Sequence, residues 1–330
     1  MAYNKTVHVV EGDIPELQPA YVKVKTLYSV ISPGTERLTI NNSESRHLSL
    51  GYSAVGVIET VGSRVTKFEM GDIVACYGAP YVHHQEILCV PETLCARVPE
   101  GMDLKKAALA GLGAIAIHAL RIAKLQFGET VVVVGLGFLG QLITKIANAS
   151  AYNVIAYDIH KARADMLKND KNIKSFATLE AMEAAIQADT HNNGADAVLL
   201  CAGGKRSPLT GQSLSWICHK GKVVIVGDVE PDFPRGPMFD KEAEILISRA
   251  GGPGRYDSIY ESEAIDYPYG LVRWTEGRNM EAYLDLLSKE RINVSGFITE
   301  EIAFENILEG YEDVLDSESS VLTKLINYTG

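Results

Sequence analysis

The sequence has no clustered basic segment, no long apolar run and few cysteines, and each absence excludes a class of protein. Among its 330 residues, 31 Lys and Arg stand against 42 Asp and Glu, so the net charge is −11. A nucleic-acid backbone is bound by a clustered basic face, so no nucleic-acid partner is expected. The apolar runs are far shorter than the roughly 20 residues that cross a membrane, and residues 1–18 lack the charged start and apolar run of a signal peptide.

Cysteine usage points to a reducing compartment. The chain has 5 cysteines, an odd number, and none forms a Cys-x-x-Cys pair; they are Cys76, Cys89, Cys95, Cys201 and Cys218. Scattered cysteines of this kind are typical of reduced, mostly buried thiols, so we expect a cytoplasmic protein. Hydrophobic residues make up 46% and charged residues 22%, as in an average globular protein. The length is enough for about two domains, each with its own core.

The amino-terminal third of the chain consists of short runs of strand length that are rich in β-branched residues. Turn residues separate these runs, and one of the predicted turns is Ser32-Pro33-Gly34. The pattern predicts an all-β unit, a small barrel. The predicted strands are 6–10, 21–31, 51–62, 72–78 and 84–90.

Near Leu104 the periodicity becomes helical, with apolar residues at i, i+3 and i+4 over 104–125. From Glu129 on, apolar strands and helices alternate, which predicts a parallel sheet with crossover helices and both faces covered. This is a doubly wound α/β domain over 112–250. Its predicted strands are 130–135, 153–158, 174–176, 195–203, 221–227 and 244–250, and its helices are 138–149, one that ends at Lys168, 178–190 and 207–218.

Beyond Gly252 the chain is aromatic and loop-like up to residue 277. The remaining pattern predicts regular structure again. We expect a helix at 279–289, a strand at 292–298, a helix at 303–315 and a final strand at 321–327.

A G-x-G-x-x-G motif, made by Gly135, Gly137 and Gly140, follows a predicted strand and opens a predicted helix. This context identifies a dinucleotide-binding turn. Gly135 allows the tight turn, Gly137 lets a pyrophosphate approach the backbone, and Gly140 lets the helix pack closely against the strand. The amino end of the helix, with Phe138 and Leu139, then presents N–H groups to the phosphates.

The next predicted strand ends in Asp158, where a carboxylate would accept the ribose hydroxyls of adenosine and repel a 2′-phosphate. NAD(H) is therefore favoured over NADP(H), although Lys161 and Arg163 follow closely and could accommodate a phosphate. Three residues at the ends of two later strands are assigned to the same cofactor site: Cys201, Ala202 and Gly227.

Two segments together resemble the medium-chain dehydrogenase/reductase superfamily. Residues 51–74 are similar to its G-H-E…G-x-V…G-D-x-V segment, and residues 105–140 are similar to its entry into the nucleotide-binding domain. The resemblance covers essentially the whole chain and implies an α/β fold. A β-rich GroES-like catalytic domain would consist of 1–111 and 251–330, and a Rossmann domain of 112–250. The resemblance further implies a homodimer through the strand at 244–250, whose apolar residues would otherwise leave an exposed sheet edge.

The positions that bind zinc in this superfamily carry other residues here. Zinc needs three or four nitrogen, sulfur or oxygen donors at close spacing. The cysteines of the first domain are too far apart for a structural-zinc loop, so we expect no zinc and no other metal. The residues at the ligand positions are Pro33 in place of Cys, Tyr52-Ser53 in place of His-Glu, and Ala110 or Gly111.

The segments ISPGTE and DYPYGLVRWTEGRNM resemble the zinc-less branch of the superfamily, which includes threonine-dehydrogenase-like, bacteriochlorophyllide-dehydrogenase-like and bi-domain oxidoreductases. Residues 252–277 look like an insertion relative to ordinary members. The insertion is either a polar and aromatic substrate wall or a surface or dimer-contact loop. The candidate wall residues are Arg255, Tyr256, Arg273 and Trp274.

Without zinc, hydrogen-bond donors and a titratable side chain must stabilise the alkoxide of an alcohol substrate. The resemblance places Thr35 at the hydroxyl that relays the substrate proton, and Glu36 at a position that orients the site or acts as the base. Tyr52 either donates to the substrate oxygen or fills the space of the metal. His83 and His84 are candidate bases, although His84 could instead begin a structural strand.

The leading hypothesis is a zinc-independent, NAD(H)-dependent dehydrogenase that acts on a secondary alcohol or ketone of a sugar, cyclitol or other polyol. A zinc-free enone or quinone reductase shares the fold but normally prefers NADPH, and Asp158 counts against it. A third hypothesis is a non-catalytic cofactor-binding subunit, because the nucleotide motif is complete while no catalytic triad is recognisable. Turnover of any alcohol by the isolated protein with NAD would dismiss this third hypothesis.

Overall fold

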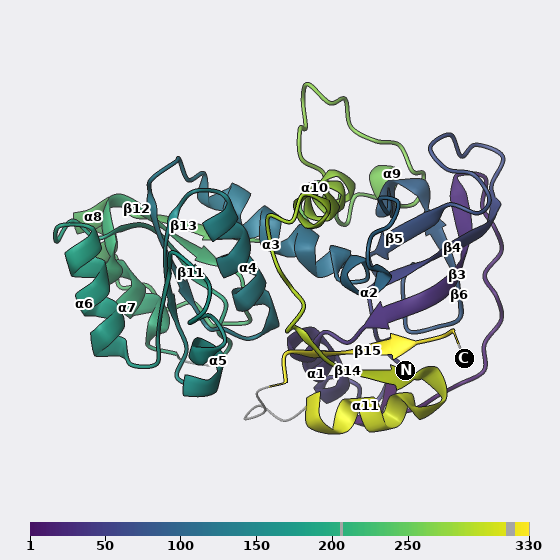
Figure 1. Cartoon of the computed structure of the whole chain (residues 1–330), viewed down its shortest axis with the longest axis horizontal. Coiled ribbons are helices and arrows are strands. Elements are labelled where there is room, and N and C mark those ends of the chain that lie inside the picture. The colour runs from purple at the N-terminus through teal and green to yellow at the C-terminus, as the bar shows by residue number, and fades with distance from the viewer. Residues whose placement is uncertain (205–206, 315–320, 330) are drawn as a thin grey trace. The chain divides into compact units, whose positions relative to one another are not determined.

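The computed structural model describes residues 1–204, 207–314 and 321–329 (Figure 1). The chain forms two compact units: a β-rich unit of residues 1–114 and 251–330, and an α/β unit of residues 115–250. Within the described residues, no helix has both the length and the hydrophobicity that a bilayer-spanning helix needs.

The α/β unit is built on a six-stranded parallel sheet in the order β10-β9-β8-β11-β12-β13. Because β8 and β11 are neighbours, the strand order reverses between them, which is the arrangement that places a dinucleotide at the carboxyl ends of these strands. Val131 to Val134 are almost fully buried, as expected for a strand covered on both faces. The strands are β8 (Thr130–Val134), β9 (Asn153–Tyr157), β10 (Ile173–Phe176), β11 (Ala195–Leu200), β12 (Ile217–Ile225) and β13 (Glu244–Ile247).

Helices alternate with these strands and confirm the predicted doubly wound fold. The predicted helix at 138–149 is found with the same bounds, and it buries Leu142, Ile143 and Ile146 against the sheet. Two predictions were wrong: the helix expected to reach Lys168 ends at Asp165, and α8 was not predicted. The helices are α4 (Phe138–Ala149), α5 (Lys161–Asp165), α6 (Leu179–Asp189), α7 (Leu209–Trp216) and α8 (Arg235–Lys241).

The β-rich unit contains a seven-stranded sheet in the order β14-β15-β3-β4-β5-β7, with β6 also paired to β3. The long strand β3 pairs antiparallel with β4, β6 and β15, so strands from both ends of the chain share one sheet. A short two-stranded ribbon precedes it. The strands are β1 (Ala2–Tyr3), β2 (Thr6–Val7), β3 (Tyr21–Val30), β4 (Ser53–Val61), β5 (Ile73–Tyr77), β6 (Ile87–Pro91), β7 (Cys95–Arg97), β14 (Ile298–Ala303) and β15 (Thr323–Asn327).

Short helices cover this sheet, and a long loop between two of them, α9 and α10, projects from the unit (Figure 1). The helical pattern at 104–125 forms two helices, α2 and α3, and α3 continues into the α/β unit. The helices are α1 (Pro33–Asn41), α2 (Leu104–Ala107), α3 (Ala110–Ala123), α9 (Ser258–Glu261), α10 (Glu276–Ser288) and α11 (Ile307–Val314), with single 3-10 turns at Glu92–Leu94 and Phe304–Asn306.

Several predictions for the β-rich unit were wrong. The expected turn at Ser32-Pro33-Gly34 is the start of helix α1, because proline fits the first helical position, where its N–H is not needed. Only two residues of the strand expected at 6–10 pair with another strand. The strand expected at 292–298 is irregular, since its apolar residues lie buried in a loop, and the strand begins at Ile298 instead. Part of the helix expected at 303–315 lies outside the described residues, and the described part begins at Ile307.

Candidate active site and cofactor site

The glycine-rich turn after β8 has the geometry that a dinucleotide needs. Gly135 has φ +93°, and a Cβ there would lie 2.5 Å from the Ala202 nitrogen, so only glycine fits. A Cβ at Gly140 would collide with the Gly135 carbonyl oxygen, which explains the close approach of helix and strand. A Cβ at Gly137 would meet nothing within 4 Å. Gly137 therefore borders open space at the N-cap of α4, where a pyrophosphate could approach the backbone.

The structure places Asp158 beside this turn, directly after β9. One carboxylate oxygen accepts the Leu136 N–H at 2.6 Å, and the other accepts the His160 N–H at 2.8 Å. Arg163 lies 4.0 Å from the first oxygen. Asp158 thus fastens the turn in place, and each of its oxygens keeps a second lone pair that could accept a ribose hydroxyl.

Cys201 and Ala202 follow β11, and Gly227 follows β12, so both strand ends lie next to the glycine-rich turn in the sheet. A Cβ at Gly227 would collide with the Ala202 carbonyl oxygen. Burial raises the pKa of the Cys201 thiol to about 12, so this thiol is protonated and unreactive at neutral pH. These residues would form a backbone wall beside the turn that adds no charge to a cofactor site. Together with Asp158 and the turn, they fit a dinucleotide.

In the β-rich unit, the carboxylate of Glu36 is the centre of a buried hydrogen-bond cluster. Glu36 lies in the first turn of α1 and is 1% exposed. Its Oε1 accepts the Ser32 N–H at 2.7 Å. Its Oε2 lies 3.1 Å from His84 Nε2 and also accepts the Tyr311 hydroxyl. With three partners, Glu36 is fixed in orientation.

His84 joins the same cluster from the loop before β6. Its Nδ1 lies 2.7 Å from the Ser29 hydroxyl oxygen, which is 2.9 Å from the Tyr328 hydroxyl. The structure therefore brings together two of the predicted catalytic residues, Glu36 and His84, as a buried pair. Its remaining members, Ser29, Tyr311 and Tyr328, were missed because nothing in their local sequence marks them.

Tyr52 lies beside the N-terminus of α1. Its hydroxyl donates to the Ser32 hydroxyl oxygen at 2.6 Å, and the exposed Thr35 side chain is also hydrogen-bonded to it. Burial raises the pKa of Tyr52, and the bonds from Ser32 and Thr35 only partly oppose this effect. At neutral pH the phenol is thus an uncharged donor. Its ring meets the Tyr77 ring edge-on, with the centroids 6.0 Å apart.

His83 lies at a different cavity from these residues. The cavity has a volume of about 340 Å³, and neither Thr35 nor Tyr52 is among its lining residues. Burial lowers the pKa of His83, and its Nδ1 has no hydrogen-bond partner in the part of the chain that the structure describes. His83 is therefore not joined to Glu36 as His84 is.

The residues at the superfamily's zinc positions have other contacts. The Ser53 hydroxyl donates to the Ala108 carbonyl at 2.6 Å and accepts the Gly111 N–H at 3.0 Å. Pro33 is the first residue of helix α1, and Tyr52 is bonded to Ser32. Across residues 1–204, 207–314 and 321–329, no three His, Cys, Asp or Glu side chains are grouped so that they could hold a metal ion. This set of residues does not fit a zinc ion.

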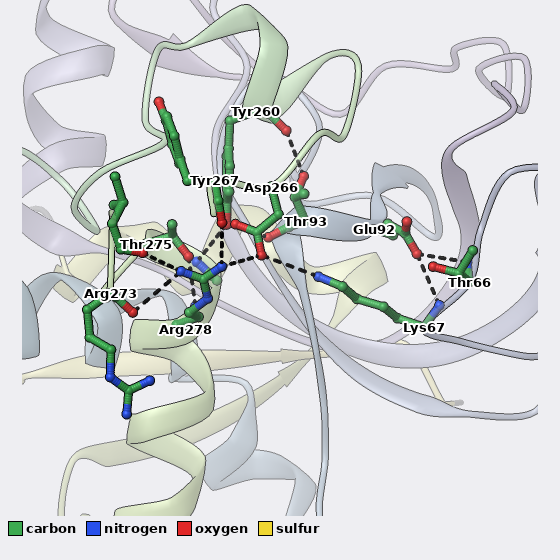
Figure 2. A network of polar contacts seen from close by, with 12 residues as sticks. Thr66, Lys67, Glu92, Thr93, Tyr260, Asp266, Tyr267, Arg273, Thr275 and Arg278 are labelled. Carbon is green, nitrogen blue, oxygen red and sulfur yellow. Dashed lines mark hydrogen bonds and ion pairs between the residues drawn. The ribbon is translucent and has the colours of Figure 1, made fainter. Parts of the chain in front are cut away.

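The segment 252–277 is anchored to other parts of the β-rich unit by polar contacts, which Figure 2 shows. The Thr93 hydroxyl donates to the Tyr260 carbonyl at 2.8 Å, and the Tyr260 hydroxyl donates to the Thr93 carbonyl at 3.1 Å. Asp266 accepts from Arg278 at 2.7 Å and lies 3.7 Å from the Lys67 ammonium. These contacts hold the segment as a fixed part of the β-rich unit.

The four candidate wall residues differ in their surroundings. Arg255 is nearly buried and donates to Glu261 at 2.6 Å and to the Ala79 carbonyl at 2.7 Å. Its charge is thus used within the protein. Arg273 lies over the Trp274 ring at 4.3 Å, as Arg255 lies over the Tyr256 ring at 4.4 Å. Tyr256 is 59% exposed and could contact a ligand.

Sequence reasoning also missed Glu276, the first residue of α10. An acidic residue in the first turn of a helix looks like an ordinary favourable contact with the helix dipole. The structure instead buries Glu276 completely, and neither of its carboxylate oxygens has a partner among the described residues.

Comparison with known proteins points to one group of enzymes. A family described as "Zinc-binding dehydrogenase" matches residues 139–264. D-xylulose reductase A of Aspergillus niger is 27% identical over 301 residues, which cover 80% of this chain and 76% of that protein. Among solved structures, an alcohol dehydrogenase from Thermus sp. ATN1 has a TM-score of 0.80 at 21% identity, covering 99% and 98% of the two chains. Galactitol-1-phosphate dehydrogenase from Escherichia coli has a TM-score of 0.77 at 19% identity, covering 97% and 96%.

Proposed function

We propose that the chain is an oxidoreductase of the medium-chain dehydrogenase/reductase superfamily, and specifically a zinc-independent polyol dehydrogenase that uses NAD(H). The names of its relatives, which act on a sugar ketose or a sugar-alcohol phosphate, support a polyol or the matching ketone as substrate. The reaction would transfer a hydride between nicotinamide and a secondary alcohol.

The observation that carries this proposal is the contact set of Tyr52. Its phenol bonds to Ser32 and Thr35 at the N-terminus of α1. The superfamily resemblance implies a metal ligand at the position of Tyr52 and a proton relay at that of Thr35. The phenol has one O–H, which donates to Ser32 in the free protein. With substrate bound, this O–H would turn from Ser32 to the substrate oxygen, and the new bond would strengthen as negative charge develops on that oxygen. Thr35 is exposed and would contact the substrate hydroxyl, whereas Tyr52 would stabilise the alkoxide.

Glu36 and His84 would support this pair as the residues that orient it and take up the proton. Glu36 binds the Ser32 backbone, so it fixes the residue that accepts from Tyr52. Bound NAD⁺ would supply the acceptor for the hydride. Tyr256, Arg273 and Trp274 would line the substrate side of the pocket, and Arg255 would hold that segment in place.

The choice of NAD(H) rests on Asp158, because a carboxylate at that position repels the 2′-phosphate of NADP(H). Independence from zinc rests on the residues at the ligand positions, above all Pro33 and Gly111. A cytoplasmic location is supported by the five cysteines, all of which are free thiols. A homodimer is supported by β13, an edge strand of the parallel sheet whose Ile247 is 69% exposed.

The test is turnover of a panel of polyols and ketoses by the purified protein, with NAD⁺ and NADP⁺ compared and the metal content measured. Thr35→Ala and Tyr52→Phe should each lower kcat by about 10²–10³-fold, as loss of one oxyanion donor does in other enzymes. Thr39→Ala is a matched control on the same helix, since Thr39 bonds only to the backbone of α1. Undiminished turnover in both variants, or one zinc ion per active chain, would contradict the proposal.

A further inference from the structure

Glu276 is a buried acid that the proposed mechanism does not use. Thr275 caps α10, and the Glu276 N–H donates to the Pro253 carbonyl at 2.9 Å, so the backbone at this point is fully bonded. The side chain is 0% exposed, and neither carboxyl oxygen has a hydrogen-bond partner in the described residues. Thr275, the residue that precedes Glu276, is labelled in Figure 2. A native protein rarely tolerates such a group without a function for it.

Tyr77, at the end of β5, connects Glu276 to the candidate active site. A Cβ placed on Gly251 would lie 2.7 Å from the Tyr77 ring and 3.0 Å from the Glu276 Cβ, so both side chains pack against this glycine. The Gly251 N–H donates toward the Tyr77 hydroxyl. The Tyr77 ring in turn meets the Tyr52 ring edge-on. A change at Glu276 can therefore reach Tyr52 through a single buried ring.

Burial favours the uncharged form of Glu276, and the one nearby cation is shared with another acid. The nearby Arg255 guanidinium is paired with Glu261 at 2.6 Å and bonded to a backbone carbonyl, so a carboxylate at 276 would be a second negative charge beside one cation. Burial raises the pKa of Glu276 to about 8, Glu261 adds to this rise, and Arg255 opposes it. At neutral pH the side chain is a neutral carboxylic acid.

We propose that Glu276 is a positioning residue for Tyr52, and that it acts through Tyr77 only while its carboxyl is uncharged. This inference rests on the proposed function, because Tyr52 must first be needed for turnover. An uncharged carboxyl lets the Tyr77 ring pack against the Tyr52 ring, which keeps the phenol beside Ser32 and Thr35. A buried carboxylate would instead attract donors with which it interacts electrostatically, the Tyr77 hydroxyl and the Arg255 guanidinium, and pull the Tyr77 ring away from Tyr52.

Glu276 is the group in this cluster whose charge would change between pH 7 and pH 9. The pKa of Tyr77 is raised well above its ordinary value, chiefly by burial, and the pKa of Tyr267 is raised to about 12, chiefly by its bond to Asp257. Burial also raises the pKa of Tyr260, and nearby acidic and phenolic groups raise that of Arg255. Glu261 is engaged in its ion pair with Arg255.

The experiment compares kcat of wild type and Glu276→Gln on the best polyol over pH 6 to 9.5. Glutamine has the shape of the protonated acid but cannot ionise. Since other pH effects cancel in the ratio of the two kcat values, the ratio should be flat below pH 7 and rise about tenfold in favour of the variant by pH 9. Glu281→Gln, an exposed acid on the same helix, should stay at the wild-type profile throughout.

The outcomes separate this inference from the proposed function. If wild type turns over no polyol or ketose, the proposed function fails. If wild type is active and the Glu276→Gln ratio stays flat to pH 9.5, the inference is overturned while the function stands. Tyr77→Ala removes the connecting ring. If Tyr77 is the link, the ratio of the Glu276→Gln to the Glu276 kcat should no longer rise with pH when both proteins carry Tyr77→Ala.

A second measurement does not depend on activity. Infrared difference spectroscopy of wild type should show a protonated carboxyl band that disappears with a midpoint near pH 8 and is absent from Glu276→Gln. A band that is lost near pH 4.5 would show that the carboxyl is ionised at neutral pH, which would also overturn the inference.

Discussion

Replacing Glu276 by glutamine should change how stability depends on pH, and the size of the effect follows from its burial. The carboxyl has a pKa of about 8 in the folded protein and 4.5 as an ordinary exposed glutamate. The folded state therefore holds the proton more tightly than the unfolded state. Its contribution to stability is fully present below pH 4.5 and is lost as the pH rises toward 8.

The magnitude comes from the gap between the two pKa values. From 4.5 to about 8 is about 3.5 pH units, and each unit is worth about 1.4 kcal/mol. Wild type should lose about 5 kcal/mol of unfolding free energy across this range relative to Glu276→Gln, about 3 kcal/mol of it by pH 7. Because the side chain is fully buried, solvent screening does not reduce this figure.

The assay is urea unfolding at pH 5, 6, 7, 8 and 9, followed by the fluorescence of Trp274 in the β-rich unit. The chain has 2 tryptophans, so all proteins carry Trp216→Phe, which leaves Trp274 as the reporter. The difference in unfolding free energy between Glu276→Gln and its parent should rise by about 1.4 kcal/mol per pH unit up to pH 8 and then level off. Glu281→Gln serves as the control. A difference that is constant with pH would refute the reasoning, because it would mean that Glu276 has the same pKa in both states.

Two further predictions concern the cofactor site. Gly140→Ala should destabilise the protein by about 1–3 kcal/mol, because the new Cβ collides with the Gly135 carbonyl, whereas Gly137→Ala should leave the melting temperature nearly unchanged and weaken NAD⁺ binding measured by calorimetry. Asp158→Ala should raise kcat/KM with NADPH relative to NADH by at least about tenfold, since it removes the charge that repels a 2′-phosphate. An unchanged coenzyme ratio would mean that Asp158 only fastens the turn through the Leu136 N–H.

The α/β unit could be predicted because its information is local. Each apolar run of strand length is followed by a helical period, so α4 was found with both bounds correct. Helix α1 was missed because Pro33 and Gly34 form turns in most contexts. In the folded protein Ser32 is the N-cap, and Pro33 is therefore the first residue of a helix. The strand predicted at 292–298 failed for a related reason, since burial in a loop gives the same apolar pattern as a sheet.

Site residues that lie in recognisable sequence segments could be predicted, whereas those contributed by remote parts of the sequence could not. Glu36 belongs to the segment ISPGTE that the family resemblance singled out, and His84 begins the strand predicted at 84–90. Tyr311 reaches Glu36 from 275 positions away, and no local pattern reports such a contact. Glu276 was missed because its burial depends on Tyr77 and Gly251, which come from two other segments.

The pairing of β15 with β3 determines the order in which the two units can fold during synthesis on the ribosome. Residues 115–250 carry all six strands of their sheet, so this unit can fold as soon as it emerges. Strand β3 is made before this unit but must wait for Thr323–Asn327, which are made after it, before its sheet is complete. Nascent chains therefore expose the part of β3 that pairs with β15 until Thr323–Asn327 have emerged, and a stop codon before Thr323 would leave a folded α/β unit attached to an unfinished β-rich one.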